Sequence, residues 1–419
     1  MTEPTTVHCA DCGTVLPTTT AQSTCAKCGG LLVVEHHPDA RGDALRALFD
    51  DRAAKIGRTT SALERSGVWR FREIVLGASD DDIVSSPEGN TPLFVREAVS
   101  KFAGVNGLLM KHEGFNPSAS FKDRGMTVAM TQARRIGAKA VACASTGNTS
   151  ASLSAYAAQA GIPSFVFVPE GNISSGKLAQ TLAYGARTLR IRGDFDDCLR
   201  LARDASDQLG VYLVNSVNPF RIEGQKTIVF ELLQQLGWRA PDWIALPAGN
   251  LGNTSAFGKA LAEAHALGLI EQVPRLLAVQ ASGAAPFAQG YAAQFSERFR
   301  VRAETRATAI RIGDPASWDR AVRAIGSTNG VVESVTDDEI FAAKAVIDRC
   351  GVGCEPASAA SVAGVRALVA RGVIRADERV VCILTGHLLK DPGGSSSALD
   401  AEALTSEQAM EFLAKVVGA

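Results

Sequence analysis

The sequence predicts an α/β fold in which helices cover both faces of parallel β-sheets. Short apolar segments alternate with longer helix-like segments through most of the chain after about Gly107. This alternation is typical of parallel strands that are joined by helical crossovers. The chain has 419 residues, of which 46% are hydrophobic and 21% are charged, so it can form two or three domains with a large buried core.

The individual elements follow from the spacing of apolar and turn-forming residues. The predicted strands are short and apolar along their length, and a glycine, Gly161, closes the first predicted helix of the alternating region. Before this region a polar stretch contains one helix-like piece, 42–57, and after it the tail from Pro392 contains a loop and a short amphipathic helix. The predicted strands are 140–145, 164–171, 188–193, 211–216, 242–250, 275–282 and 380–386, and the predicted helices are 149–161, 176–186, 195–210, 221–237 and 254–268.

Composition and charge exclude several classes of function. A formal net charge of −1 gives no electrostatic support for a nucleic-acid partner. No apolar run reaches the length of about 18 residues that a membrane-spanning helix needs. The first residues lack the basic and apolar regions of a secretion signal and leave no room for a transit peptide before the first cysteine. Nine cysteines, an odd number, therefore favour the reducing cytoplasm.

Four of the cysteines form two closely spaced pairs. Two residues separate Cys9 from Cys12 and Cys25 from Cys28, and twelve residues lie between the pairs. This is the spacing of a four-thiolate zinc ribbon, in which each pair directs two sulfur atoms at one ion. Free thiols in a loosely structured terminus, or a redox pair, are the alternatives. Because four protein ligands leave no open position, we expect a structural zinc that is remote from catalysis.

Small polar residues follow three of the predicted strands, where ligands bind in open parallel sheets. Each group also has a simpler interpretation, because Ser, Thr and Asn commonly cap helices and glycines are common in turns. The glycine loop matches neither a Walker loop nor a G-x-G-x-x-G motif. The residues are Ser145, Thr146, Asn148 and Thr149 after the first strand, Gly249 and Gly252 after the second, and Thr385 after the third.

Lys122 occupies an unfavourable position at the start of a predicted helix. The positive end of the helix dipole repels a lysine in the first turn. A solvated lysine tolerates this, and so does a lysine that binds a cofactor covalently, because a Schiff base or a lowered pKa removes part of the charge. Together with the three strand ends, Lys122 suits pyridoxal phosphate, which needs a lysine, anchors for its phosphate, and partners for its O3′ and its ring nitrogen.

Several longer segments occur in a fixed order between about Ser86 and Asp391, among them EGNTPL, EGFNPSASFKDRG, ASTGNTSASLSAYAAQAG, VNSVNPFRIEGQKT, PAGNLGNTSAFGKA, TAIRIGDP and TGHLLKD. In these segments the sequence resembles the threonine synthases, a family of fold-type II (tryptophan synthase β-like) pyridoxal-phosphate enzymes. A cysteine-rich N-terminal extension also occurs in some members. The resemblance implies two parallel-sheet α/β domains, and we expect a zinc-ribbon-like module at 1–35, a helical connector at 36–85, a large cofactor domain at 86–119 and 221–395, a small domain at 120–220 and a tail helix at 396–419.

The resemblance also implies a role for individual residues. Lys122 would bind the cofactor covalently, Asn148 would donate a hydrogen bond to its O3′, and Thr385 would face its ring nitrogen. A threonine hydroxyl at that point does not force ring protonation as a carboxylate would. The cofactor phosphate would bind to Gly249, Asn250, Leu251, Gly252 and Asn253, the substrate α-carboxylate to Ser145, Thr146 and Thr149, and the substrate phosphate to Asn215, Ser216 and Arg221 with help from Asn253.

The implied enzyme is a phosphate-releasing carbon–oxygen lyase, usually a homodimer. It would convert O-phospho-L-homoserine and water to L-threonine and phosphate by β,γ-replacement, with Lys122 removing the α-proton and then the β-proton. Phosphate would leave Cγ and water would add at Cβ. The residue type supports Arg221 independently, because the forked donors of a guanidinium match a phosphate. The alternative for Arg221 is a salt bridge at a solvated helix start.

Three departures from the usual family sequence leave the substrate open to alternatives. Members commonly have Thr-Gly in place of Ser118-Ala119, Gly in place of Leu388, and a more apolar segment in place of 172–177. The first alternative is a related lyase or synthase for another activated amino acid, of the cysteate synthase or threonine dehydratase type. The second is a zinc-ribbon binding protein on an inactive enzyme scaffold, and the intact set of cofactor residues argues against it.

Overall fold

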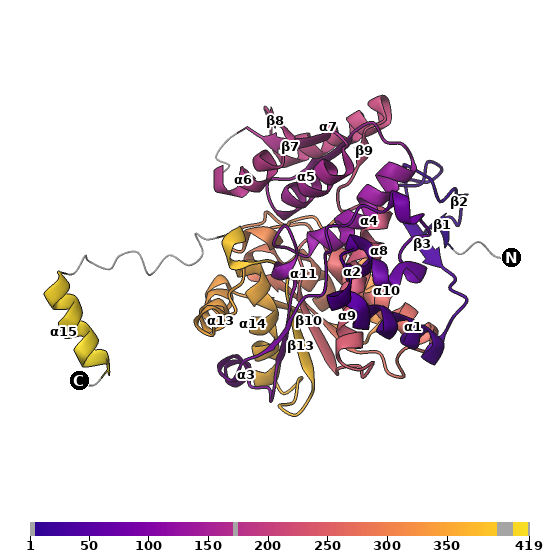
Figure 1. Ribbon diagram of the computed structural model, residues 1–419. Coiled ribbons are helices and arrows are strands. Elements are labelled where there is room, and N and C mark those ends of the chain that lie inside the picture. The colour runs from indigo at the N-terminus through magenta and orange to yellow at the C-terminus, as the bar shows by residue number, and fades with distance from the viewer. Residues whose placement is uncertain (1–4, 171–174, 392–404, 418–419) are drawn as a thin grey trace.

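The described part of the chain contains three β-sheets (Figure 1). The computed structural model describes residues 5–170, 175–391 and 405–417. A small antiparallel sheet near the N-terminus has the order β2-β1-β3, the largest sheet has the order β12-β11-β10-β13-β5-β4, and the third has the order β8-β7-β6-β9. The strands are β1 Thr5–Cys9, β2 Val15–Leu16, β3 Leu32–His36, β4 Leu93–Val95, β5 Leu109–His112, β6 Val141–Ala144, β7 Ser164–Pro169, β8 Arg187–Ile191, β9 Tyr212–Leu213, β10 Trp243–Pro247, β11 Arg275–Ala281, β12 Val331–Val335 and β13 Val380–Leu384.

The predicted parallel sheets are confirmed, with one exception at an edge. All pairs in the two larger sheets are parallel apart from β4, which pairs antiparallel with β5. The sequence analysis did not identify β4, β5 or β12. The β4 strand has only three residues, and β12 lies at an edge with an alternating burial pattern instead of a continuous apolar run.

The helices cover both faces of the two larger sheets, as neighbouring residues of the strands demonstrate. In β6, Val141 and Cys143 pack with α4 and α5, whereas Ala142 and Ala144 pack with α7 on the opposite face. In β10, Ile244 packs with α9 and α10. The helices are α1 Gly42–Lys55, α2 Ala62–Arg65, α3 Glu97–Ala103, α4 Lys122–Arg135, α5 Asn148–Ala160, α6 Ser175–Ala183, α7 Phe195–Leu209, α8 Pro219–Gln225, α9 Thr227–Gln235, α10 Gly252–Ala266, α11 Pro286–Ala292, α12 Trp318–Ser327, α13 Asp337–Arg349, α14 Pro356–Ala370 and α15 Ser406–Val417.

The predicted helix 221–237 is wrong in its start and its continuity. It consists of α8 and α9, which are separated at Lys226. The first of them begins at Pro219, because the Asn218 side chain accepts a hydrogen bond from the backbone N–H of Phe220 and a proline is favourable at the first helical position. The new start brings Arg221 inside α8.

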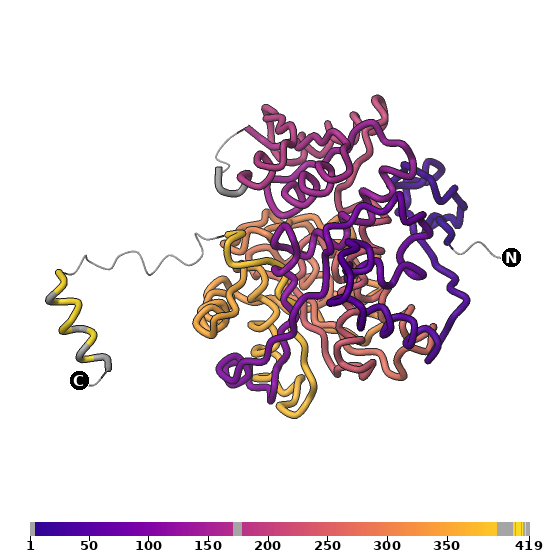
Figure 2. Tube along the Cα trace, viewed as in Figure 1, coloured from indigo at the N-terminus to yellow at the C-terminus, as the bar shows by residue number. Residues whose placement is uncertain are grey.

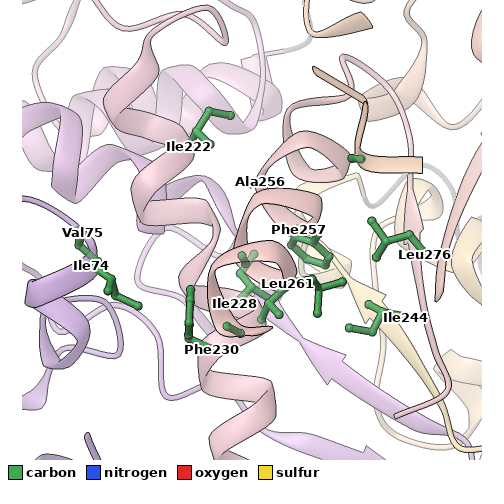
Figure 3. Packing of buried hydrophobic residues seen from close by; sticks show 14 of the residues in the cluster. Ile74, Val75, Ile222, Ile228, Phe230, Ile244, Ala256, Phe257, Leu261 and Leu276 are labelled. Carbon is green, nitrogen blue, oxygen red and sulfur yellow. The ribbon is translucent and has the colours of Figure 1, made fainter. Parts of the chain in front are cut away.

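The N-terminal sheet packs into the main hydrophobic core. Val7, Leu32 and Val34 of this sheet belong to the same buried cluster as Ile74 of the 3₁₀ segment Trp69–Ile74 and Phe230 of α9. Figure 3 shows side chains of this cluster from α8, α9, α10 and the adjoining strands, and the trace in Figure 2 shows the N-terminal segment against the rest of the chain. The module and the connector therefore share their core with the large sheet.

The remaining sequence predictions concern the domain boundaries, the C-terminal tail and the segment 172–177. All four strands of the smaller sheet lie within 120–220, but the domain boundaries themselves stay a prediction. The tail helix appears as α15, while the tail loop before it lies outside the described residues. Of the departing segment 172–177, residues 172–174 also lie outside them. No helix in the described ranges is both long and apolar enough to cross a membrane.

Candidate active site

A cavity of about 1050 Å³ lies where strands of the two larger sheets end. Its walls contain the residues that follow β6 and β9 in one sheet and β10 and β13 in the other, which is where parallel sheets bind ligands. Every residue that the sequence analysis assigned to the cofactor or the substrate lines it. These residues are Lys122, Ser145, Thr146, Asn148, Thr149, Asn215, Ser216, Arg221, Gly249, Asn250, Leu251, Gly252, Asn253 and Thr385.

The loop before α4 fixes the position of Lys122, the first residue of that helix. The backbone N–H of Phe121 donates to the Thr385 carbonyl at 3.0 Å, which ties the loop to the end of β13. The Asp123 carboxylate accepts hydrogen bonds from the backbone N–H and the hydroxyl of Ser118, at 2.6 and 2.5 Å. These bonds hold the amine at the junction of the two sheets.

The surroundings of Lys122 favour its neutral form. Burial lowers the pKa of the Lys122 amine to about 7, the charge of Arg221 acts in the same direction, and the Glu355 carboxylate opposes both. The Lys122 Nζ lies 4.2 Å from the centre of the Phe121 ring. Near neutral pH a large fraction of this amine is therefore unprotonated, as a nucleophilic or proton-accepting lysine requires.

Arg221 is a buried cation in the same cavity. Its side chain is 1% exposed, and burial lowers the pKa of the guanidinium to about 10. One donor, Nη1, bonds to the Val214 carbonyl at 3.0 Å, whereas the buried Nε has no hydrogen-bond partner among the described residues. A buried donor without a partner costs free energy, so this group fits an anionic ligand.

The neighbours of Arg221 differ in how freely they can reach a ligand. The Asn215 amide exchanges two hydrogen bonds of 3.1 Å with the backbone of Ala144, so it ties the ends of β6 and β9 together and keeps one free N–H. The Ser216 hydroxyl accepts a hydrogen bond of 2.8 Å from the Asn250 amide, so its own hydrogen can still be donated. Of these two residues, Ser216 has the more available donor.

The glycine loop after β10 has the backbone geometry of a phosphate-binding loop. A Cβ on Gly249 would lie 3.0 Å from Cα of Ile310, so a side chain there is disfavoured, and Leu251 has a left-handed φ of 62°. The Asn253 Oδ1 accepts a hydrogen bond from Gln225 at 2.7 Å, while its buried Nδ2 has no partner in the described part of the chain. The exposed backbone and the free amide fit the phosphate of pyridoxal phosphate.

Glu355 was not predicted from the sequence, although it lines the cavity and connects two predicted cofactor residues. The Asn148 Nδ2 donates to one carboxylate oxygen of Glu355 at 3.0 Å, and the Thr385 hydroxyl donates to the other at 3.3 Å. Burial raises the pKa of this carboxyl group. The only signal was an isolated acid in the apolar segment GVGCEPASAA, and Gly386 leaves room for it, because a Cβ there would lie 2.5 Å from its carboxyl carbon.

Two departures from the family sequence can be placed. Ala119 lines the cavity and has a left-handed φ of 67°, a conformation that glycine adopts without strain. Leu388 is not part of the cavity wall, whereas its neighbour Leu389 is. Ala119 is therefore in direct contact with the cavity, whereas the Leu388 side chain is not.

The four paired cysteines form one cluster, and they do not line the cavity. Their sulfur atoms all lie within 4.8 Å of one another, with Cys9 and Cys28 at 3.4 Å and Cys12 and Cys25 at 3.7 Å. A tetrahedral zinc with Zn–S bonds of about 2.3 Å needs sulfur atoms roughly 3.8 Å apart. The cluster fits such an ion, which would close it completely.

Comparison with known proteins agrees with this geometry. A family model described as pyridoxal-phosphate dependent enzyme matches residues 84–386. The threonine synthase of Methanosarcina acetivorans is 46% identical over 391 residues, 92% of each chain, and that of Methanocaldococcus jannaschii is 41% identical over 98% of each chain. Among solved structures, the processed form of threonine deaminase isoform 2 from Solanum lycopersicum has the same fold, with a TM-score of 0.64 at 18% identity over 92% of this chain and 97% of that chain. The chain therefore belongs to the fold-type II pyridoxal-phosphate-dependent enzymes, in the family that contains the threonine synthases.

Proposed function

We propose that the protein converts O-phospho-L-homoserine and water to L-threonine and phosphate. The observation that carries this proposal is that Lys122 and the buried Arg221 line one cavity without an ion-pair partner among the described residues. Lys122 suits the cofactor and Arg221 suits a phosphate on the substrate. The curated relatives that carry this activity in their names support the same assignment.

The cofactor would be held at four points of the cavity. Lys122 would bind it covalently, Asn148 would donate to its O3′, the loop 249–253 would hold its phosphate, and Thr385 would face its ring nitrogen. When bound, pyridoxal phosphate supplies an electron sink that makes protons on the substrate carbons removable. Glu355 would orient Asn148 and Thr385, because it accepts a hydrogen bond from each.

The substrate would lie between Lys122 and the ends of β6 and β9. Ser145, Thr146 and Thr149, at the positive end of α5, would bind the α-carboxylate. Arg221 and Ser216 would bind the phosphate at the far end of the substrate. Once the substrate amine takes its place on the cofactor, the Lys122 amine, with a pKa near 7, could accept the α-proton at neutral pH, return that proton to the cofactor-bound substrate, and then accept the β-proton. A positioned base of this kind contributes about 10²–10⁴-fold.

For the cysteine cluster we infer one structural zinc bound by Cys9, Cys12, Cys25 and Cys28. Elemental analysis of protein purified without chelator should find one zinc per chain, and its absence would contradict the assignment. We also propose that the protein is cytoplasmic, because its thiols need reducing conditions. We propose that it is a homodimer, because the family that it resembles is usually dimeric. Sedimentation of the purified protein tests the dimer.

An activity screen tests the proposed function against its alternatives. Purified protein is supplied with pyridoxal phosphate and with O-phosphohomoserine, O-phosphoserine or threonine, and released phosphate and amino-acid products are measured. Threonine and phosphate from O-phosphohomoserine alone support the proposal. Turnover of only O-phosphoserine or threonine would indicate the cysteate synthase or dehydratase type, and a protein that fails to bind the cofactor would be a binding protein on an inactive scaffold.

A further inference from the structure

The helices that carry the two cavity cations are locked together by two glycines. In α4, which begins at Lys122, a Cβ on Gly125 would lie 2.9 Å from the carbonyl oxygen of Arg221. In α8, a Cβ on Gly224 would overlap the carbonyl oxygen of Arg124. The two backbones therefore touch without intervening side chains, which fixes the side of α8 that faces α4 and leaves its remaining contacts to orient the rest of the helix.

The opposite side of α8 is held by the N-terminal sheet. Glu223 follows Arg221 by two residues, and its carboxylate lies 2.9 Å from the Nε2 of His36 at the end of β3. Both side chains are 1% exposed. Lys226 contacts the same carboxylate at 2.6 Å, and Lys259 of α10 also binds it, so Glu223 is fully enclosed by donors.

The hydrogen-bonding role of His36 follows from its charge and its second partner. Burial and the charge of Lys226 lower the pKa of His36 to about 4, although the Glu223 carboxylate opposes them. The imidazole is therefore neutral at physiological pH, and it can donate only one N–H. Its Nδ1 lies 3.1 Å from the Thr5 hydroxyl, which can donate to it, so the Nε2–H donates to Glu223.

Two further bonds tie β3 to the large sheet beside this contact. Lys259 donates to the Val34 carbonyl as well as to Glu223, and Arg320 of α12 donates to the Leu32 carbonyl. The N-terminal sheet thus contacts α8, α10 and α12 along one strand, and Figure 1 shows β3 beside α8 with α4 close by. The His36–Glu223 bond is the direct connection from this sheet to the helix of Arg221.

We propose that the N-terminal sheet (β1–β3) positions the substrate-phosphate residue Arg221 through the His36–Glu223 hydrogen bond. Glu223 and His36 act as positioning residues, because neither lines the cavity. The module, which the sequence analysis expected to be remote from catalysis, then contributes to substrate binding. This inference rests on the proposed function of Arg221 as the phosphate ligand.

The test compares the holoenzyme with a His36→Leu variant, which removes the donor without adding or removing a charge at neutral pH. A displaced α8 weakens the Arg221 contact, so KM for O-phosphohomoserine should rise about tenfold, the size expected when a hydrogen bond to a charged group is lost. The kcat value should stay within about twofold, because Lys122 and its cofactor contacts are not altered. The dissociation constant of inorganic phosphate, measured by calorimetry, should rise by a similar factor.

Three further variants separate positioning from general destabilisation. His36→Gln keeps an N–H donor and should restore most of the wild-type KM. Thr5→Val removes the bond that orients His36 and should raise KM by a smaller factor of about two to three, so it tests the inference even where His36→Leu does not fold. His8→Ala is the matched control on β1, because its contact with Glu35, at 3.8 Å, is partly exposed and faces away from α8; it should leave KM unchanged.

The outcomes distinguish this inference from the proposed function. A wild-type enzyme that releases no phosphate from O-phosphohomoserine contradicts the proposed function. If the wild type is active, and if His36→Leu and Thr5→Val both keep its KM and its phosphate affinity, the positioning role is contradicted and the proposed function is not. Equal changes in KM for His36→Gln and His36→Leu would also overturn it, because the donor would then be irrelevant.

Discussion

Two groups of charged side chains lie next to each other in this chain, and they differ in whether the charges are compensated. In the first, Arg124 binds Glu113 at 2.7 Å and Glu231 at 2.8 Å, and all three side chains are fully buried. In the second, Lys122 and Arg221 face the cavity without an ion pair to any described residue. Only one residue separates Lys122 from Arg124, so one short segment, KDR, contributes to both groups.

The pKa values of Glu231 and Lys122 show how compensation affects the charged forms of the two groups. Burial alone would raise the pKa of Glu231, but Arg124 and Lys111 lower it well below its ordinary value. Burial lowers the pKa of Lys122 to about 7, although the Glu355 carboxylate opposes this shift. The first group is therefore stable in its charged form without a ligand, whereas the second has no ion-pair partner among the described residues and can be compensated by an anionic ligand.

The largest expected effect is on the cavity lysine. Lys122→Ala should remove the absorbance band of the lysine-bound cofactor and lower turnover by more than about 10⁴-fold, because both the covalent link and the base are lost. The unfolding temperature of the apoprotein should not fall, because no ion pair is broken. Full activity in this variant would show that the cavity lysine is not the cofactor residue.

The opposite pattern is expected for the compensated group. Arg124→Met leaves the buried Glu113 carboxylate without its ion pair, whereas Glu231 keeps Lys111 and Arg70, so the free energy of unfolding should fall by about 3–5 kcal/mol. Urea denaturation of the apoprotein measures this, with Lys122→Met, two residues earlier, as the control. A loss of stability that is as large in Lys122→Met as in Arg124→Met would remove the distinction between the two groups.

The pH dependence of stability sharpens the same comparison. Lys122 has a pKa of about 7 in the folded apoprotein, below its ordinary value of 10.5, so between these pH values the unfolded chain binds more protons. The contribution of Lys122 to the free energy of unfolding should therefore increase as pH rises from about 7 to 10.5. Lys122→Met should lose this increase, and identical pH profiles for both proteins would contradict the lowered pKa.

The smallest effect is expected at Ala119, where the chain departs from its family. Ala119→Gly relieves the left-handed φ of 67°, which costs roughly 1–2 kcal/mol for a residue with a side chain, but it also adds freedom to the unfolded chain, about 0.4–1 kcal/mol. Thermal unfolding should show a net gain between about zero and about 1.6 kcal/mol. A loss of stability would mean that the methyl group makes favourable contacts in the cavity wall.

Much of the site could be predicted from sequence because its residues lie in short local motifs. Lys122, Asn148, Gly249 and Thr385 each follow a strand or start a helix, and parallel sheets bring such positions together. The role of Arg221 was implied by the resemblance to the threonine synthases, and the donor pattern of its guanidinium supported that role. Local spacing and residue chemistry located the strand ends, and the resemblance supplied the individual roles.

The residues that sequence reasoning missed depend on contacts between distant segments. Glu355 is an isolated acid whose importance appears only when α14 brings it next to Asn148. Gly125 and Gly224 look like ordinary helix residues until two backbones cross at them. His36 and Glu223 are 187 positions apart, so nothing in the sequence pairs them. The edge strand β12 was also missed, because buried residues alternate along it with partly or fully exposed ones instead of forming a continuous apolar run.

The measurement that tests the account most directly is steady-state phosphate release from O-phosphohomoserine by wild type and by Arg221→Leu. The uncompensated cation should bind the substrate phosphate, so kcat/KM should fall by about 10²-fold or more, as expected from losing a charge-assisted hydrogen bond and the charge itself. The cofactor absorbance should stay unchanged, because Lys122 and the phosphate loop are intact. A variant with the wild-type kcat/KM would mean that Arg221 does not bind the substrate phosphate, and the central claim would be wrong.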